Sequence, residues 1–334
     1  MSDPVLVEVT RGGLVESRHH GAVAVVDADG RIVLALGDVD APVYPRSAVK
    51  ALQALVLVES GAADRYGFGD EDLALACASH AGEPGHVAGV TRMLTRAGLS
   101  VDDLQCGAHA PMHKASAEAL VRAGQAPSPL HHNCSGKHAG FLCAACQMNA
   151  DIASYCEVAH PVQREVRAAL EAMSGRAIPD ADIGIDGCSV PTFAMPLAGL
   201  ARAFARFATG QGLAPARAEA VRRLRAACAA KPWHVAGTGQ FVTQVMEHFG
   251  ARVFVKAGAE GAYCAALPEQ GLGVAVKCDD GAGRAAEAIT AAVLAKLLDR
   301  DARAFLATFA RRPLRNWRKV VVGEIRPADV LALR

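Results

Sequence analysis

Aromatic residues and lysine are scarce in this chain. Only 5% of its 334 residues are Phe, Tyr or Trp, and 8 lysines stand beside 27 arginines. A lysine within a motif is therefore more informative here than in an average protein. The chain also lacks an excess of one charge, because its net charge is only +1. This balance argues against nucleic acid or an anionic membrane surface as the main partner, and it slightly favours a small ligand.

Long hydrophobic runs are missing as well. No apolar stretch approaches the roughly 18 residues that a membrane helix needs, so the sequence predicts no membrane span. The first residues contain no basic segment followed by a hydrophobic one, which argues against a signal peptide. The ten cysteines are too few for a disulfide scaffold in a chain of this length. We therefore expect a cytoplasmic protein whose thiols are mostly reduced.

Apolar residues make up 51% of the chain, which is enough for a large core. Apolar runs rich in β-branched residues, bounded by turn signals, predict strands near both ends of the chain, at 5–9, 21–27, 31–36, 252–255, 261–267, 273–277 and 319–324. Apolar runs that end near glycine or proline predict helices at 48–59, 86–97, 115–123, 139–148, 162–173, 197–208, 215–230, 241–249 and 285–298.

The order of these elements predicts the fold class. No long Pro/Gly/Ser linker separates the parts, so the helical segment is expected as an insertion between the two halves of one sheet. Successive hairpins favour an antiparallel sheet and an α+β fold over a parallel doubly wound one. We expect residues 1–46 and 235–334 to form a sheet domain, residues 47–234 to form a mainly helical domain, and the active site to lie between them.

A serine and a lysine stand three residues apart where the first long helix is expected to begin. Positions i and i+3 share one face of a helix, so Ser47 and Lys50 can act together. The helix N-terminus favours a developing alkoxide, and a desolvated, neutral lysine can accept the hydroxyl proton. Serine acyl-transferring enzymes use this Ser-x-x-Lys arrangement. The alternative is that Ser47 only caps the helix.

Ser79 ends another apolar segment and is followed by His80 and a turn at Gly82. A serine at such a position can project into a cleft, although it can also bond to neighbouring backbone. Lys256 ends an apolar strand before two glycines. In serine enzymes of the penicillin-recognising type, a late strand beside the cleft carries a lysine, so Lys256 is a candidate second base. The alternative is a solvated lysine at a hairpin edge.

Small and polar residues crowd the segment 132–140, just before an apolar helix. Cys134 and Lys137 lie three residues apart within it. The glycine spacing of a phosphate-binding loop is absent, which excludes a nucleotide site of that kind. The pattern is compatible with a metal site that has thiolate ligands, with Cys188 as a distant partner. The alternative is that Cys134 and Cys188 are unligated small residues or form a disulfide.

Taken in chain order, these motifs resemble the rhizobial-type (class 3) L-asparaginases over roughly residues 5–325. The Asp-Gly-Cys sequence at 186–188 and the segment 256–263 also carry the resemblance. It implies a fold similar to serine β-lactamases and glutaminases, with an antiparallel sheet flanked by helices and an additional helical domain. It further implies a homodimer that hydrolyses L-asparagine to L-aspartate and ammonia.

The resemblance also implies roles for individual residues. The catalytic set would be two Ser–Lys pairs, Ser47 with Lys50 and Ser79 with Lys256. One zinc ion would be bound by Cys134, Lys137 and Cys188, and it would shape the pocket more than generate hydroxide. The residues expected to line the same cavity and bind substrate are Arg46, Asn133, His138 and Asp186.

Amide chemistry fits these residues. The reaction needs a nucleophile, a base, an acid for the departing ammonia and donors for the oxyanion, and two serines with two lysines can share these roles. The expected helix start favours Ser47 as the attacking group, while the alternative is that Ser79 attacks and Ser47 relays a proton. Arg46 could bind the α-carboxylate of the substrate and Asp186 its α-ammonium group.

Two other functions remain open from the sequence. A glutaminase or another serine amidase of the same fold would differ in a pocket longer by one methylene, which is worth only about 1–3 kcal/mol. A non-catalytic zinc-binding protein is the second alternative.

Overall fold

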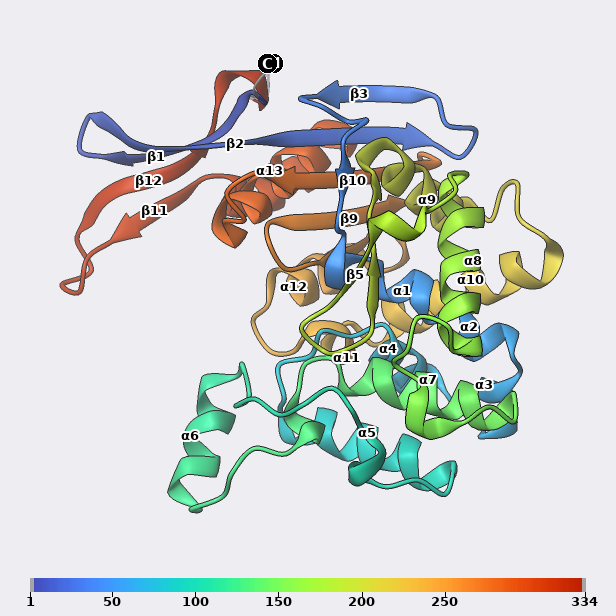
Figure 1. The fold of residues 1–334 in the computed structure, drawn as a ribbon. Coiled ribbons are helices and arrows are strands. Elements are labelled where there is room, and N and C mark those ends of the chain that lie inside the picture. Colours follow the sequence, from blue (N-terminus) through green and yellow to red (C-terminus); the bar gives the residue numbers. More distant parts are fainter. Residues whose placement is uncertain (1–2, 332–334) are drawn as a thin grey trace.

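The computed structural model describes residues 3–331, and these contain an eight-stranded antiparallel sheet (Figure 1). The strands lie in the order β11-β12-β1-β2-β10-β9-β8, and β3 pairs with the second half of β2. The strands are β1 (Val5–Arg11), β2 (Leu14–Asp27), β3 (Ile32–Leu36), β8 (Phe254–Ala257), β9 (Ala262–Leu267), β10 (Leu272–Cys278), β11 (Arg312–Arg315) and β12 (Val321–Pro327). The sheet therefore joins the two ends of the chain.

The centre of β2 shows that this sheet is buried on both faces. Successive side chains of a strand point to opposite faces, yet all five residues from 22 to 26 are at most 3% exposed. They form an uninterrupted apolar run, which is typical of a strand covered on both sides. The helices α9 (Leu197–Thr209) and α13 (Gly283–Leu297) both pack against the neighbouring strand β10.

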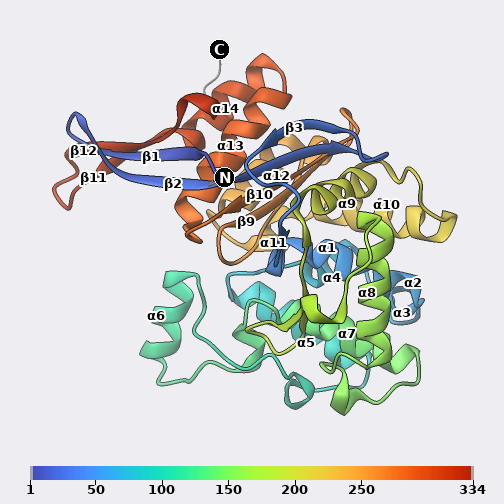
Figure 2. The same ribbon diagram turned by 45° about the horizontal axis from the view of Figure 1, so that its top comes forward.

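The chain between β3 and β8 is mostly helical, and in Figure 2 most of these helices lie together on one side of the sheet. Besides α9, its helices are α1 (Lys50–Gln53), α2 (Leu55–Glu59), α3 (Ala62–Arg65), α4 (Asp70–Ala76), α5 (Pro84–Arg96), α6 (Lys114–Arg122), α7 (Ser135–Gln147), α8 (Pro161–Ser174), α10 (Pro215–Ala230), α11 (Pro232–Ala236) and α12 (Phe241–Phe249). A 3-10 turn, η1 (Arg46–Val49), precedes α1, and α14 (Arg300–Ala310) follows α13.

The predicted α+β class, with an antiparallel sheet, flanking helices and a further helical part, is confirmed. The helix expected at 48–59 is divided into η1, α1 and α2. The sequence did not predict the short helices α3, α4 and α11, nor α14 and β11. It also did not predict two small sheets, which pair β4 (Pro42–Val43) with β7 (Met195–Pro196) and β5 (Ile183–Ile185) with β6 (Pro191–Phe193). Within the described residues, no helix is long and apolar enough to cross a membrane.

Two glycines allow backbone segments to approach each other closely. A Cβ at Gly136, on α7, would lie 2.3 Å from the carbonyl oxygen of Leu75 on α4. A Cβ at Gly258, just after β8, would lie 2.4 Å from the carbonyl oxygen of Pro45, just before η1. Because only glycine lacks a Cβ, these positions let α4 meet α7 and β8 meet η1 at backbone distance.

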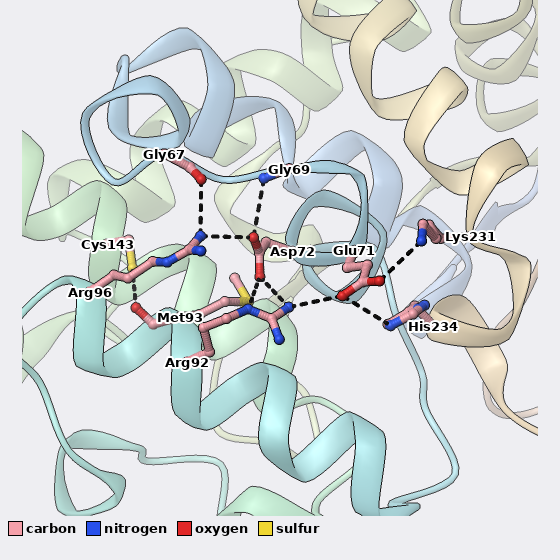
Figure 3. Close-up of polar contacts among 10 residues, drawn as sticks. All are labelled: Gly67, Gly69, Glu71, Asp72, Arg92, Met93, Arg96, Cys143, Lys231 and His234. Atoms are coloured by element: carbon pink, nitrogen blue, oxygen red, sulfur yellow. Dashed lines mark hydrogen bonds and ion pairs between the residues drawn. The ribbon is translucent and has the colours of Figure 1, made fainter.

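A buried carboxylate fixes α4 to its neighbours (Figure 3). Asp72 is 3% exposed, and its two oxygens bind Arg92 Nη2 at 2.7 Å and Arg96 Nη1 at 3.1 Å, both on α5. The adjacent Glu71 binds Lys231 Nζ at 3.0 Å, just before α11. The start of α4 is thus tied to two other helices by ion pairs.

Replacing Asp72 by Asn should lower the free energy of unfolding by about 2–3 kcal/mol. The expected loss is below that of a fully buried ion pair because Arg92 and Arg96 are 37% and 39% exposed. Urea unfolding followed by circular dichroism measures the change. Glu16→Gln is the matched control, since it breaks an exposed pair with Arg11 and should cost much less than Asp72→Asn. Equal losses in the two variants would contradict the assignment.

Candidate active site

Ser79 lies shortly after α4, and its hydroxyl contacts two lysines. Its Oγ is 3.0 Å from Nζ of Lys50 and 2.7 Å from Nζ of Lys256. Its backbone N–H donates to the carbonyl oxygen of Val235, on α11, at 2.9 Å. Three segments distant in sequence therefore meet at this serine.

Both lysines are buried, each 1% exposed. The amine of Lys50 meets three oxygen atoms, namely Ser79 Oγ and the carbonyl oxygens of Ala78 at 2.7 Å and Asn133 at 3.3 Å. This set matches the three donors of an ammonium group. Burial and the nearby charge of Lys50 lower the pKa of Lys256 well below its usual value. A single hydroxyl thus contacts one amine with three oxygen acceptors and a second amine whose pKa is lowered.

Ser47 and Ser79 line one cavity of about 270 Å³. Its other lining residues come mainly from the start of α12, the β8–β9 turn and α13, and they include Met112, Asn133, Gln240, Phe241, Lys256, Tyr263 and Glu287. Within residues 3–331, the Ser47 side chain forms no hydrogen bond, so its hydroxyl is available to a ligand. The structure places the amine of Lys50 against Ser79, without a polar contact to Ser47.

Arg46 and Asp186 form an ion pair beside Ser47. Nε and Nη2 of Arg46 lie 2.7 and 2.6 Å from one oxygen of Asp186, Oδ1, which also accepts the N–H of Gly187 at 2.7 Å. Arg46 has a φ of 51°, a left-handed conformation that is strained for a residue with a side chain. Neither partner lines the cavity.

Asn133 and His138 have different surroundings. The backbone of Asn133 is held by His109, whose Nε2 accepts its N–H at 3.0 Å, while its carbonyl oxygen accepts the N–H of His80 at 3.2 Å. His138 is fully buried and does not line the cavity. Its Nδ1 lies 2.7 Å from the Tyr155 hydroxyl, and its Nε2 has no partner among the described residues. Burial lowers the pKa of His138 well below its usual value, so its ring is neutral.

The three predicted metal ligands lie together next to Asn133, whose Oδ1 is 3.2 Å from Sγ of Cys134. Nζ of Lys137 is 3.1 Å from Sγ of Cys188, and both residues are at most 2% exposed. A hydrogen bond between the thiols lowers the pKa of Cys134 well below its usual value and raises that of Cys188, so the pair readily loses one proton. Burial opposes a charge on Lys137, but the two sulfurs outweigh burial and raise its pKa.

This donor set fits zinc. Zinc prefers nitrogen and sulfur ligands, and a site with three protein ligands leaves a fourth position open. Without a metal, the cluster is an ammonium group beside a shared thiolate, so zinc must displace protons from it. All ten cysteines are free, and Cys134 and Cys188 are therefore available as ligands.

Sequence reasoning missed part of the cavity wall. Glu287 is the only acidic residue of the alanine-rich helix α13, which was the available signal for it. Glu83 is a second missed residue, because its carboxylate accepts hydrogen bonds from the N–H and the hydroxyl of Thr238, each at 2.7 Å. These bonds fix the loop that leads to Gln240 and Phe241 in the cavity wall.

Residues 7–327 match the family model described as L-asparaginase II. No curated protein matches the chain significantly. A β-lactamase from Mycobacterium bovis is 17% identical, over 83% of this chain and 94% of that one, with a TM-score of 0.41. Simvastatin synthase from Aspergillus terreus is 12% identical, over 87% and 92% of the chains, with a TM-score of 0.43. Scores this low carry no inference about activity, whereas the family match confirms the resemblance found in the sequence.

We expect the purified protein to bind one zinc ion per chain, with an affinity that rises from about pH 6 to about pH 8. The metal competes with protons for two sulfurs and an amine, so fewer protons favour binding. Titration against a chromophoric chelator at both pH values measures the affinity. Cys188→Ser should lose the ion, and Cys264→Ser, equally buried in β9, should keep it. A wild-type protein that binds no zinc at either pH would contradict this site.

Proposed function

The chain belongs to the L-asparaginase II family, and on this premise we propose that it hydrolyses the side-chain amide of L-asparagine to L-aspartate and ammonia. The observation that carries the proposal is the hydroxyl of Ser79 between two buried lysine amines, in a cavity shared with a second serine. A hydroxyl within reach of a neutral amine is the arrangement that serine-dependent amide hydrolysis needs.

Ser47 is the proposed nucleophile. Its hydroxyl has no protein partner within residues 3–331 and faces the cavity, whereas that of Ser79 is already bonded to two amines. In this scheme Ser47 attacks the amide carbon, and its proton passes through Ser79 to the neutral amine of Lys256. The ammonium group of Lys50 stays bonded to Ser79 Oγ and stabilises the negative charge on this oxygen while the proton passes through it.

Collapse of the tetrahedral intermediate completes the first half of the reaction. The C–N bond breaks, the Lys256 ammonium returns its proton through Ser79 to the leaving nitrogen, and ammonia departs. The aspartyl group is then an ester on Ser47. Water, deprotonated by the same Ser79–Lys256 pair, attacks this ester, and L-aspartate leaves as Ser47 recovers its proton.

Arg46 lies outside the cavity lining but directly precedes Ser47, which faces the cavity. We propose that its side chain reaches the α-carboxylate of a substrate bound at Ser47. Asp186 binds Nε and Nη2 of the Arg46 guanidinium, and Nη1 remains available. Zinc, held by Cys134, Lys137 and Cys188, would be a weak Lewis acid because two thiolates neutralise it. We assign it the role of fixing the segment that carries Asn133.

Ammonia release from asparagine and glutamine, measured side by side, tests the function. We expect a higher kcat/KM with asparagine. Ser47→Ala and Ser79→Ala should each lower kcat at least about 100-fold, because members of an interdependent catalytic set are costly to remove. Unchanged circular dichroism spectra would show that both variants fold. A higher kcat/KM with glutamine would instead support the alternative that the protein is a glutaminase. No turnover of either amide would support the alternative of a non-catalytic zinc-binding protein.

The nucleophile can be identified directly in the same experiment. Acid quenching during turnover, followed by peptide mass spectrometry, should find the aspartyl ester on Ser47. An ester on Ser79 would reverse the two serine roles and leave the reaction otherwise intact.

The lowered pKa of Lys256 predicts the pH profile. Protonated Lys256 cannot accept a proton, so kcat/KM should rise with pH as this lysine loses its charge. Because its pKa is lowered, the rise should end well below the usual lysine value of about 10.4. Lys256→Arg should lose at least about 100-fold in kcat, since a guanidinium does not deprotonate. Lys277→Arg, which lies outside the cavity lining, is the control and should retain the wild-type profile. A normal rate in Lys256→Arg would remove this lysine from the mechanism.

A further inference from the structure

The residues that line the 270 Å³ cavity include one carboxylate, that of Glu287. It projects from α13, on a different element from either serine. The one lysine among the lining residues is Lys256. Within the described part of the chain, the cavity therefore has a hydroxyl-and-amine region and a separate anionic region.

One of the two oxygens of the Glu287 carboxylate has no protein partner within residues 3–331. Its Oε1 accepts a hydrogen bond from Nη1 of Arg312 at 2.5 Å, while Oε2 has no hydrogen bond to any residue in 3–331. The Glu287 side chain is 21% exposed. An ion pair that only held α13 to β11 would not require this side chain to line the cavity.

Two aromatic rings lie on the same wall. Phe241 and Tyr263 are in a T-shaped arrangement with ring centroids 5.9 Å apart, and both line the cavity with Glu287. The Glu287 carboxylate is close enough to Tyr263 to reinforce the effect of burial on its pKa, which is raised. A carboxylate beside aromatic rings is favourable for an ammonium group, by charge and by cation–π attraction.

Asp186 is less suited to bind an ammonium group. It is the carboxylate that the sequence suggested for this role, but it lies outside the cavity lining. Its Oδ1 binds two nitrogens of Arg46 and the N–H of Gly187, whereas Glu287 binds a single guanidinium nitrogen. In both residues the second carboxylate oxygen has no hydrogen bond within residues 3–331. The contacts of Oδ1 make Asp186 a residue that orients Arg46.

We propose that Glu287 binds the α-ammonium group of the amide substrate, with Phe241 and Tyr263 beside it. This inference rests on the proposed amide hydrolysis and names its substrate class, amides that carry a free amino group. Amides in which that group is absent or acylated lose the charge that Glu287 recognises, so they are poor substrates.

A pair of substrates tests the inference on the intact protein. Asparagine and succinamic acid differ only in the amino group. Glu287→Gln should raise KM for asparagine about 10- to 100-fold, as expected for loss of a charged hydrogen bond, and change kcat much less. The same variant should change kcat/KM for succinamic acid less than about threefold. Equal losses on the two substrates, or an unchanged KM for asparagine, would overturn the proposal.

Arg312→Gln separates recognition from a structural role. It breaks the same ion pair but keeps the carboxylate, so KM for asparagine should stay the same or fall. The comparison is made near pH 8, because burial raises the pKa of Glu287 and Arg312 opposes that effect. If Arg312→Gln and Glu287→Gln lose activity equally, Glu287 only supports the fold.

Binding measured by calorimetry tests the ammonium site without requiring hydrolysis, so the two proposals can fail independently. Wild-type protein should bind L-aspartate more tightly than succinate, and Glu287→Gln should reduce that difference at least about tenfold. A protein that discriminates in this way without hydrolysing asparagine would contradict the proposed function and retain the ammonium site. A protein without the discrimination would overturn the ammonium site.

Discussion

The shared hydroxyl of Ser79 is the interaction on which the rest of the site depends. Two buried amines cannot both carry a charge within about 3 Å of one oxygen without a large desolvation and repulsion cost. Lys50 is surrounded by carbonyl oxygens that favour its charge, while Lys256 has fewer acceptors and a lowered pKa. The close backbone contacts at Gly136 and Gly258 are what bring α4, α7, η1 and β8 near enough for this arrangement.

Local sequence patterns were sufficient to predict the fold class but not the side-chain contacts within the site. Uninterrupted apolar runs and helices bounded by glycine or proline follow from residues close in sequence, and most of these elements were predicted. The strand predicted at 21–27 is the apolar second half of β2, which begins at Leu14 with a stretch of alternating exposure. The partner of Lys50 could not be predicted in this way. Helical spacing suggested Ser47, but the Lys50 amine bonds to the carbonyl oxygen of Ala78 and to Ser79 Oγ, almost thirty residues away, and to the more distant carbonyl oxygen of Asn133. Strands as short as β4 and β5 carry too few residues for a periodic signal.

Some candidate site residues face the cavity, and others lie outside its lining and support the residues that face it. Ser47, Ser79, Asn133 and Lys256 face it, and the sequence motifs contain all four. His138, the cysteine cluster and the Arg46–Asp186 pair lie outside its lining. Glu287 belongs to the cavity but not to any motif, because its significance comes from the packing of α13 and not from its sequence neighbours. A motif marks the presence of a site more reliably than it marks the full set of groups a ligand touches.

The strand order also has a consequence for how the protein forms during synthesis. Val23 on β2 pairs with Val276 on β10, so the middle of the sheet joins residues that leave the ribosome far apart in time. Contacts of such long sequence separation form slowly. Until β10 has been made, the valine-rich strand β2 exposes an unpaired edge and apolar faces, which are the features that drive aggregation. The pocket, which needs Lys256 from β8, is therefore among the last parts of the molecule to be completed.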